Sequence, residues 1–369
     1  MAHPPTLYLA ITNHGFGHAT RAAAVAATLQ RQLPELRLIV ATTAPTWLLE
    51  SYLAPGYEYR AQQFDIGVLQ SDSLTMDKAA TLEKLQWIRA NQDDILADEI
   101  EFLRQAQVDL VLADIPPLAT VLAQAAGIPC WMMSNFGWDF IYRPWGGEFE
   151  AIADWIAACF SQCDRIFRLP FHEPMAAFPN IIDVGLTGGS PRFSVDQLRA
   201  RYGFTAPVEK TVLLTFGGLG LAQIPYQAIT EFADWQFITF DREAPDLPNL
   251  FKVSDRSLRP VDFMPICDRV VSKPGYSTFS ETCRLDRGLV TLPREGFAEA
   301  ALLLQGIQDY ARHQILDADA FFSGDWSFLH QPLLSPRQAQ PIDKRGNEAI
   351  AGAIADYFLI PSKSYSHSI

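Results

Sequence analysis

The sequence predicts an α/β protein in which a parallel sheet, covered by helices on both faces, is formed twice along the chain. Three observations predict this fold class. The 369 residues exceed one ordinary core and suggest two domains of roughly 180 residues each. Apolar strand-like runs alternate with amphipathic segments, as in parallel sheets. In each half, the first strand-like run ends in a glycine-rich loop.

The first half begins with the apolar run Leu7–Ile11, which is followed by Gly15 and Gly17. Glycines let the backbone turn tightly and approach a ligand. The alanine-rich segment Ala19–Leu29 has the residues of a helix. Further strands are predicted at Leu36–Ala41, Val108–Ala113, Ile128–Met133 and Arg165–Arg168.

Glycine and proline interrupt this pattern over residues 182–191, where we place the domain boundary. We expect an N-terminal domain of residues 1–186 and a C-terminal domain of residues 187–369. In the second, strands are predicted at Thr211–Phe216, Trp235–Phe240, Leu250–Val253, Arg269–Ser272 and Gly288–Leu292. The last helical pattern, about Gly346 to Phe358, would close the second domain or cross back to the first.

Composition excludes several function classes. The formal net charge is −13, with 42 acidic against 29 basic residues and no Lys/Arg run, so we expect no nucleic-acid partner. No 18-residue apolar stretch or signal-peptide pattern occurs, which favours a cytoplasmic protein with at most peripheral membrane association. The five cysteines are scattered through apolar sequence, which favours buried free thiols and no metal site. They are Cys130, Cys159, Cys163, Cys267 and Cys283.

The first glycine loop carries the first candidate chemistry. Thr20 stands where a dinucleotide fingerprint has its third glycine, and no glycine-rich run precedes Lys-Ser or Lys-Thr. Dinucleotide cofactors and P-loop ATPases are therefore disfavoured. His14 and His18 lie beside a helix start, which attracts negative charge. Acid/base work near neutral pH favours His18, whereas His14 fits an acceptor-binding residue and a member of a satisfied loop equally well.

Two further loops lie in the second half. Gly217, Gly218 and Gly220 surround Leu219 after a strand. Their N–H groups could bind a phosphate, or the segment could be a plain turn. After the strand Arg269–Ser272, Gly275 precedes a helix that Ser277 or Thr278 opens. One turn later, Glu281 is placed to accept hydrogen bonds from a ribose diol, or to act as a capping-box acid.

Asn135 to Trp155 is dense in aromatic residues, which suit either a sugar-binding face or ordinary core. Asn135 and Trp138 are the acceptor-site candidates here, with Asp139 a weaker choice. Asp114, which ends a strand, would orient His18, act as the base itself or cap the following turn.

The two glycine loops, together with Pro274–Glu281, resemble those of GT-B glycosyltransferases. They are similar to the bacterial enzyme that adds N-acetylglucosamine to the lipid-linked muramyl precursor, and to its plant relative, monogalactosyldiacylglycerol synthase. Residues 14–21 and 135–142 also resemble the N-terminal glycosyltransferase-like region of plant L-arabinokinase. The resemblance covers about residues 6–358 and implies two Rossmann-like domains that face each other across a cleft.

The resemblance also implies roles for matching residues. His18 would activate the acceptor hydroxyl, Glu281 would bind the ribose, and the base, usually uracil, would meet the backbone at Phe263 and Met264. Where many members have a polar pair for the donor sugar, this chain has Arg294, which would face the diphosphate, and Glu299, which would face the sugar. The expected donor-site residues are Gly17, Gly217, Gly218, Leu219, Phe263, Met264, Gly275, Ser277, Thr278, Glu281, Arg294 and Glu299.

We therefore expect a metal-independent glycosyltransferase that takes its sugar from a nucleotide sugar, for which the resemblance favours a UDP-sugar. The nucleotide sugar is then a substrate, and no cofactor is expected. The acceptor would be a small molecule, a glycan or a lipid. Two alternatives stay open: a nucleotide-sugar epimerase or hydrolase on the same fold, and a non-catalytic nucleotide-sugar sensor.

Overall fold

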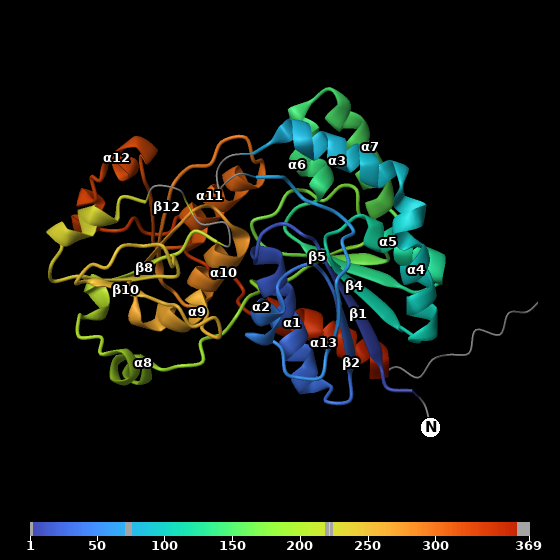
Figure 1. Ribbon diagram of the computed structural model, residues 1–369, viewed down its shortest axis with the longest axis horizontal. Helices are drawn as coiled ribbons and strands as arrows, with labels where there is room; N and C mark the ends of the chain where they lie inside the picture. Colours follow the sequence, from blue (N-terminus) through green and yellow to red (C-terminus); the bar gives the residue numbers. More distant parts are fainter. Residues whose placement is uncertain (1–2, 71–75, 218–220, 222–223, 360–369) are drawn as a thin grey trace, which may run out of the picture.

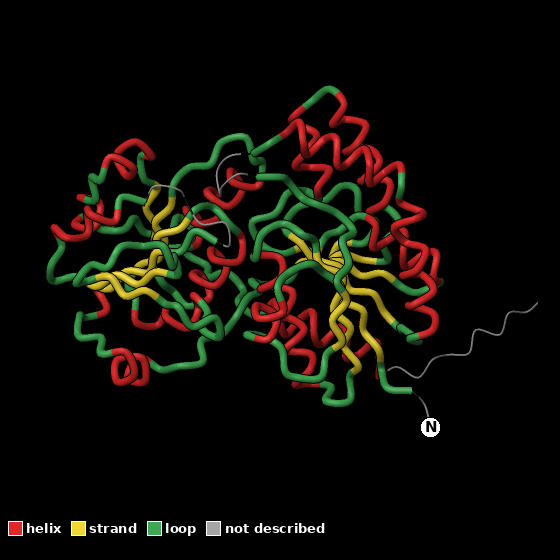
Figure 2. The backbone as a smooth tube through the Cα atoms, in the orientation of Figure 1, coloured by secondary structure: helices red, strands yellow, loops and turns green. Residues whose placement is uncertain are grey.

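The computed structural model describes residues 3–70, 76–217, 221 and 224–359. It consists of two α/β halves, each built around a sheet whose strands are all parallel (Figures 1 and 2). The predicted fold class is therefore confirmed. Helices lie between the two sheets and around them.

Seven strands form the first sheet, in the order β3-β2-β1-β4-β5-β6-β7. They are β1 (Thr6–Ile11), β2 (Arg37–Ala41), β3 (Glu58–Arg60), β4 (Leu110–Asp114), β5 (Cys130–Ser134), β6 (Arg165–Arg168) and β7 (Ile181–Asp183). Six strands form the second sheet, in the order β10-β9-β8-β11-β12-β13. They are β8 (Thr211–Leu214), β9 (Gln236–Thr239), β10 (Leu250–Lys252), β11 (Arg269–Ser272), β12 (Gly288–Thr291) and β13 (His313–Ile315).

Helices connect the strands. Those within the first half are α1 (Gly17–Gln32), α2 (Thr46–Glu50), α3 (Lys78–Ala90), α4 (Gln92–Gln105), α5 (Leu118–Ala126), α6 (Trp138–Tyr142) and α7 (Glu148–Phe160). Later in the chain follow α8 (Val195–Tyr202), α9 (Pro260–Phe263), α10 (Tyr276–Arg284), α11 (Glu299–Tyr310), α12 (Ala318–Ser323) and α13 (Gly346–Leu359).

The ten predicted strands are all present, but β3, β7 and β13 were not predicted. Each of the three is an edge strand of three residues, too short to show a hydrophobic pattern. β7 even overlaps the segment that we expected to be a linker. Its residues are exposed, so only backbone pairing with β6 reveals it as a strand.

Both sheets are buried on two faces, as parallel sheets require. Along β1, Leu7, Leu9 and Ile11 pack into one apolar cluster, whereas Tyr8 and Ala10 pack into another on the opposite face. The first of these clusters continues through the second half. A third cluster covers the far face of the second sheet. The two halves therefore share part of one core.

The last helix packs against the first. α13 lies beside α1 (Figure 1), although it follows the second sheet in the sequence. Ile350 and Ile354 insert into the core that α1 shares. Asn347 holds the connection between the halves, because its side chain accepts from the Gly188 N–H at 3.0 Å and donates to the Gly188 carbonyl at 2.8 Å. The chain thus crosses between the halves twice.

A second contact between the halves lies at Phe171, in the loop after β6. Its φ of 60° is positive, and its ring lies over Gly306 of α11. A Cβ at Gly306 would lie 2.0 Å from the Phe171 Cδ1 atom, which is too close for any side chain. Glycine at this position therefore allows α11 to pack against the first half.

All five cysteines are buried and free, as predicted. Within the described ranges, no helix combines the length and apolar character needed to cross a membrane.

Candidate active site

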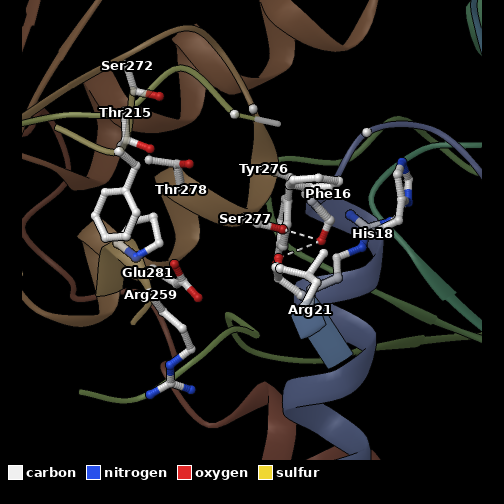
Figure 3. Close-up of a pocket in the computed structure, with 18 of the residues that line it drawn as sticks. Phe16, His18, Arg21, Thr215, Arg259, Ser272, Tyr276, Ser277, Thr278 and Glu281 are labelled. Atoms are coloured by element: carbon white, nitrogen blue, oxygen red, sulfur yellow. Dashed lines mark hydrogen bonds between the residues drawn. The ribbon is translucent and has the colours of Figure 1, made fainter. Parts of the chain in front are cut away.

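A cavity of about 450 Å³ lies between the two halves. The order of each sheet explains its position. β1 lies next to β4, and β8 lies next to β11, and ligands of open parallel sheets bind outside the carboxyl ends of such strands. The loops after β1, β8 and β11 all line the cavity, together with the first turns of α1 and α10 (Figure 3).

Ten of the predicted site residues line this cavity, and six lie elsewhere. Those lining it are His14, Gly17, His18, Gly217, Gly275, Ser277, Thr278, Glu281, Arg294 and Glu299. Those not lining it are Asp114, Asn135, Trp138, Asp139, Phe263 and Met264. Gly218 and Leu219 lie outside the described residues.

The first glycine loop brings the halves into contact. Gly15 has a φ of +61°, which favours glycine. A Cβ at Gly17 would lie 3.4 Å from the Ser277 Oγ atom of the second half, which donates to the Gly17 carbonyl at 2.7 Å (Figure 3). Because the Ser277 hydroxyl proton is used in this way, its backbone N–H is the donor that stays available for a phosphate.

His18 and Asp114 form a buried pair. The His18 Nδ1 atom lies 2.8 Å from the Asp114 Oδ1 atom. The Arg21 guanidinium forms a bidentate ion pair with the same carboxylate. Its Nε atom donates to Oδ2 and its Nη2 atom to Oδ1, both at 2.6 Å. Arg21 Nη2 also lies 3.0 Å from His18 Nδ1, but the shorter contact is with Asp114, which can only accept when ionised; this contact favours a proton on Nδ1 and a lone pair on Nε2. His18 lines the cavity, so Asp114 holds its imidazole in a fixed orientation there.

Arg21 keeps Asp114 ionised. Burial by itself raises the pKa of this fully buried carboxyl, but Arg21 and then His18 lower the pKa below its usual value. Arg21 is itself 1% exposed, and its guanidinium lies 5.1 Å from the centre of the Tyr276 ring. Arg21 is therefore part of the site, although sequence reasoning gave it no role.

Asn135 connects this pair to the second half. Its Oδ1 atom accepts from Arg21 Nη1 at 2.8 Å, and its Nδ2 atom donates to Glu299 Oε1 at 2.8 Å. Asn135 is fully buried and does not line the cavity. The acceptor contact expected for it is therefore replaced by a bridge beneath the cavity floor.

The aromatic segment after β5 is core in this structure. Trp138 is 1% exposed, stacks on Tyr142 and donates from Nε1 to Thr12 Oγ1 at 3.2 Å. Asp139 lies beside Glu173, where burial first and this neighbour second raise its pKa to about 6. The sequence left core and acceptor site equally open for these aromatics, and the packing around Trp138 favours core.

His14 lines the cavity with a fixed tautomer. Its Nδ1 atom accepts from the Val68 N–H at 3.2 Å, so Nε2 carries the proton. The ring stacks on Phe297 of the second half, with centroids 5.9 Å apart. Burial, followed by His18 and Arg294, lowers its pKa well below the usual value. His14 is thus a neutral hydrogen-bond donor at pH 7.

The opposite wall suits an anion. α10 begins at Tyr276, and its first N–H groups face the cavity from the second half. Lys273 precedes this turn and approaches Gly217, where a Cβ would lie 3.3 Å from its Cε atom. Gly217 has a φ of +80°. Cationic and helix-dipole charge therefore meet at the ends of β8 and β11.

Glu281 lies one turn into α10 and is 5% exposed. Its Oε1 atom accepts from the Gly189 N–H at 2.7 Å and lies 3.5 Å from the Tyr52 hydroxyl. Burial raises its pKa to about 7, although the Gly189 hydrogen bond and Arg259 act in the opposite direction. This carboxyl lines the cavity, and its partner is the interdomain linker rather than an N-cap residue.

Phe263 and Met264 are fully buried in the core of the second half. Phe263 packs against Phe251 and Phe240, because α9 turns these side chains away from the cavity. Near them, the cavity wall consists of Phe240, Val253, Leu258, Arg259 and Pro260.

Arg294 and Glu299 follow β12 on the cavity floor. The Arg294 guanidinium lies 4.1 Å from the centre of the Phe297 ring and is 8% exposed. Glu299 is the first residue of α11, where the helix dipole favours a carboxylate. Sequence reasoning missed Lys273, Tyr52 and Phe297 in this cavity. Lys273 alone carried a signal, its place between a strand and Pro274-Gly275.

Comparison with known proteins decides the fold family. No family model matches the chain. The L-arabinokinase of Arabidopsis thaliana is 31% identical over 307 residues, which make up 81% of this chain but 29% of that protein. The chain therefore spans less than a third of the curated relative that it matches.

Solved glycosyltransferase structures superpose on almost the whole chain. The calicheamicin glycosyltransferase CalG4 matches with a TM-score of 0.62 at 15% identity, over 98% of this chain and 100% of its own. UDP-glucose:anthocyanidin 3-O-glucosyltransferase, in complex with UDP, matches with 0.61 at 12% identity, over 96% and 95%. This chain has the GT-B fold. Arabidopsis thaliana UGT89C1, complexed with UDP, agrees, with a TM-score of 0.59 at 12% identity over 95% and 99% of the two chains.

The GT-B fold and the likeness to L-arabinokinase were both expected from the sequence, and both are confirmed. The resemblance to the muramyl-precursor and galactolipid enzymes stays a prediction. In this GT-B chain, the cavity lies between the two halves and takes residues from both.

Proposed function

We propose that this GT-B chain is a glycosyltransferase that moves a sugar from a nucleotide sugar to a hydroxyl group. One observation carries the proposal. The cavity has the buried His18–Asp114 pair on the side of the first half and the α10 N-terminus on the side of the second. A base and an anion site on opposite walls are the parts that such a transfer needs.

On the first wall, His18 Nε2 accepts the proton of the acceptor hydroxyl as its oxygen attacks the anomeric carbon of the donor. Asp114 holds the imidazole through Nδ1 at 2.8 Å and stabilises the imidazolium that forms. Positioned proton transfer of this kind is worth on the order of 10²–10⁴-fold in rate.

On the second wall, the bond between the anomeric carbon and the phosphate oxygen breaks, and its electron pair leaves with the nucleoside diphosphate. The first N–H groups of α10, Lys273 and Arg294 oppose the charge of this leaving group. These groups belong to the chain itself, so the proposal requires no metal ion.

For the nucleotide, we propose UDP. Glu281 accepts hydrogen bonds from the ribose, and Phe240, Val253 and Leu258 provide an apolar wall for the base. Two of the GT-B structures compared above are complexes with UDP, which supports this choice. The identity of the transferred sugar and of the acceptor is left to experiment.

Calorimetry with UDP, dTDP, GDP and ADP tests the donor site. We expect selective binding of UDP, unchanged by EDTA, and a loss of about 10–100-fold in affinity in Glu281→Ala, since hydrogen bonds to a charged group are worth about 1.5–3 kcal/mol. Glu209→Ala, an exposed acid of the same half outside the cavity, is the matched control. Failure of all four nucleotides to bind would contradict the proposal.

Turnover separates the proposal from its alternatives. UDP-sugars are incubated with and without a panel of hydroxyl acceptors, and the products are analysed. Acceptor-dependent transfer that falls at least about 100-fold in His18→Ala supports the proposal. Conversion of donor alone indicates a hydrolase or epimerase, and binding without conversion indicates a sensor. Transfer that persists in His18→Ala would remove this residue as the base.

A further inference from the structure

A short segment of the first half lines the cavity beside Glu281. Figure 3 shows Glu281 and Arg259 of the second half away from His18. The first half contributes α2 and the two residues after it to the cavity wall, through Trp47, Leu48, Ser51 and Tyr52. Of these, Tyr52 contacts Glu281. The surroundings of this carboxyl group are therefore built by both halves.

The Tyr52 side chain is held in place from two sides. A Cβ atom at Gly189 would lie 2.9 Å from the Tyr52 Cε1 atom, so the ring packs closely on the interdomain linker. The Arg259 guanidinium carbon lies 4.6 Å from the centre of the ring. Burial, followed by Glu281, raises the pKa of Tyr52 well above its usual value. Its hydroxyl therefore keeps its proton, and can both donate and accept.

Both Tyr52 and Glu281 have hydrogen-bonding capacity left for a ligand. The Glu281 Oε1 atom accepts from the Gly189 N–H at 2.7 Å, whereas the Tyr52 hydroxyl lies 3.5 Å from the same oxygen. Hydrogen bonds between a hydroxyl and an oxygen normally measure 2.5–3.0 Å, so the Tyr52 contact is long and weak. Among the described residues, no hydrogen bond uses the Glu281 Oε2 atom. A carboxylate oxygen and a tyrosine hydroxyl thus lie side by side in the cavity wall.

We propose that Tyr52 is a second ribose-binding residue, contributed to the donor site by the first half. The inference rests on the proposed function, in which Glu281 binds the ribose of the nucleotide. One hydroxyl of the ribose diol donates to Glu281 Oε2, and the neighbouring hydroxyl bonds the Tyr52 hydroxyl. The site therefore recognises the two hydroxyls separately and selects a ribonucleotide over its deoxy forms.

Calorimetry with UDP, 2′-deoxy-UDP and 3′-deoxy-UDP tests this division of the diol. It is carried out at pH 8, above the pKa of about 7 of Glu281, so that the carboxylate is ionised. Tyr52→Phe removes the hydroxyl and keeps the ring that packs on Gly189. The matched control is Tyr57→Phe, a half-buried tyrosine of the same half that does not line the cavity.

We expect Tyr52→Phe to bind UDP about 3–10-fold more weakly than wild type, as the loss of one hydrogen bond predicts. Its preference for UDP over one of the two deoxy nucleotides should fall by the same factor. Its preference over the other should stay, because Glu281 still binds that hydroxyl. Tyr57→Phe should match wild type with all three ligands.

Three results would overturn the proposal: unchanged UDP affinity in Tyr52→Phe, an equal loss of affinity for all three nucleotides, or an equal fall in both preferences. The second would show a structural role, and the third an action through Glu281 alone. Each of these results leaves UDP binding to the wild type intact. If the wild type binds no UDP, the proposed donor fails and this inference fails with it, so the two failures are distinguishable.

Discussion

Replacing Asp114 with asparagine leaves the Arg21 guanidinium buried without its carboxylate. Asp114 is fully buried and Arg21 is 1% exposed, so solvent screening does little to reduce their interaction. Breaking a buried ion pair by removing one partner costs about 3–5 kcal/mol. Since about 1 kcal/mol shifts the Tm of a domain of this size by roughly 2–4 °C, we expect the Tm of the first half to fall by about 6–20 °C.

Urea unfolding of wild type, Asp114→Asn, Arg21→Gln and the double variant measures this free energy. We expect the double variant to be less destabilised than the sum of the two single changes, by at least about 1 kcal/mol, because the second change removes the unpaired charge that the first one creates. A loss below about 1 kcal/mol in Asp114→Asn, or additive effects, would refute the view of Arg21 as a charge held by Asp114.

Two further predictions concern the pH dependence of stability and the contact between the halves. The folded-state pKa of Glu281 is about 7, against a usual value of 4.5, so the folded protein binds the extra proton between these values. The free energy of unfolding should therefore fall as pH rises from about 4.5 to 7, by about 3 kcal/mol at most. In Glu281→Gln, this pH dependence should disappear when urea unfolding is compared at pH 5 and pH 8. The same pH dependence in both proteins would disprove the prediction. Gly306→Ala places a Cβ against Phe171 and should destabilise by about 1–3 kcal/mol, whereas Gly352→Ala, which meets nothing within 4 Å in α13, should stabilise by up to about 1 kcal/mol. Calorimetric unfolding of both variants checks the contrast, and equal effects would contradict it.

Sequence reasoning found the strands that lie inside the sheets because they are apolar on both faces. β1 and β8 each carry an unbroken apolar run into a glycine loop, a signal that depends on neighbouring residues alone. β3, β7 and β13 were missed, since a three-residue edge strand is defined largely by its pairing with a distant segment. Their sequences contain no pattern of their own. β10, the remaining edge strand, is equally short but was predicted, at Leu250–Val253.

The residues of the candidate site also fall into those that a local sequence pattern predicts and those that it does not. His18 and Glu281 could be predicted because each lies in a local strand-loop-helix signature. Arg21 could also have been found, since it lies three residues after His18 on the same helix, where side chains meet. The bridge from Asn135 to Glu299 spans 164 residues of chain, and no local pattern connects its two ends. For Trp138 the sequence left two interpretations open, because aromatic residues suit a core as well as a sugar, and only the packing favours core.

Because α13 packs on α1, the first half can complete its core only late in synthesis. The first half needs Ile350 and Ile354 to fill its core, yet these residues are translated only after the whole second half. During synthesis, the apolar face of α1 that α13 later covers stays open while the whole second half is translated. The second half lies between the two crossings and can fold while the ribosome is still translating. The cavity between the halves is therefore completed only after the second half has been translated, when α13 packs on α1.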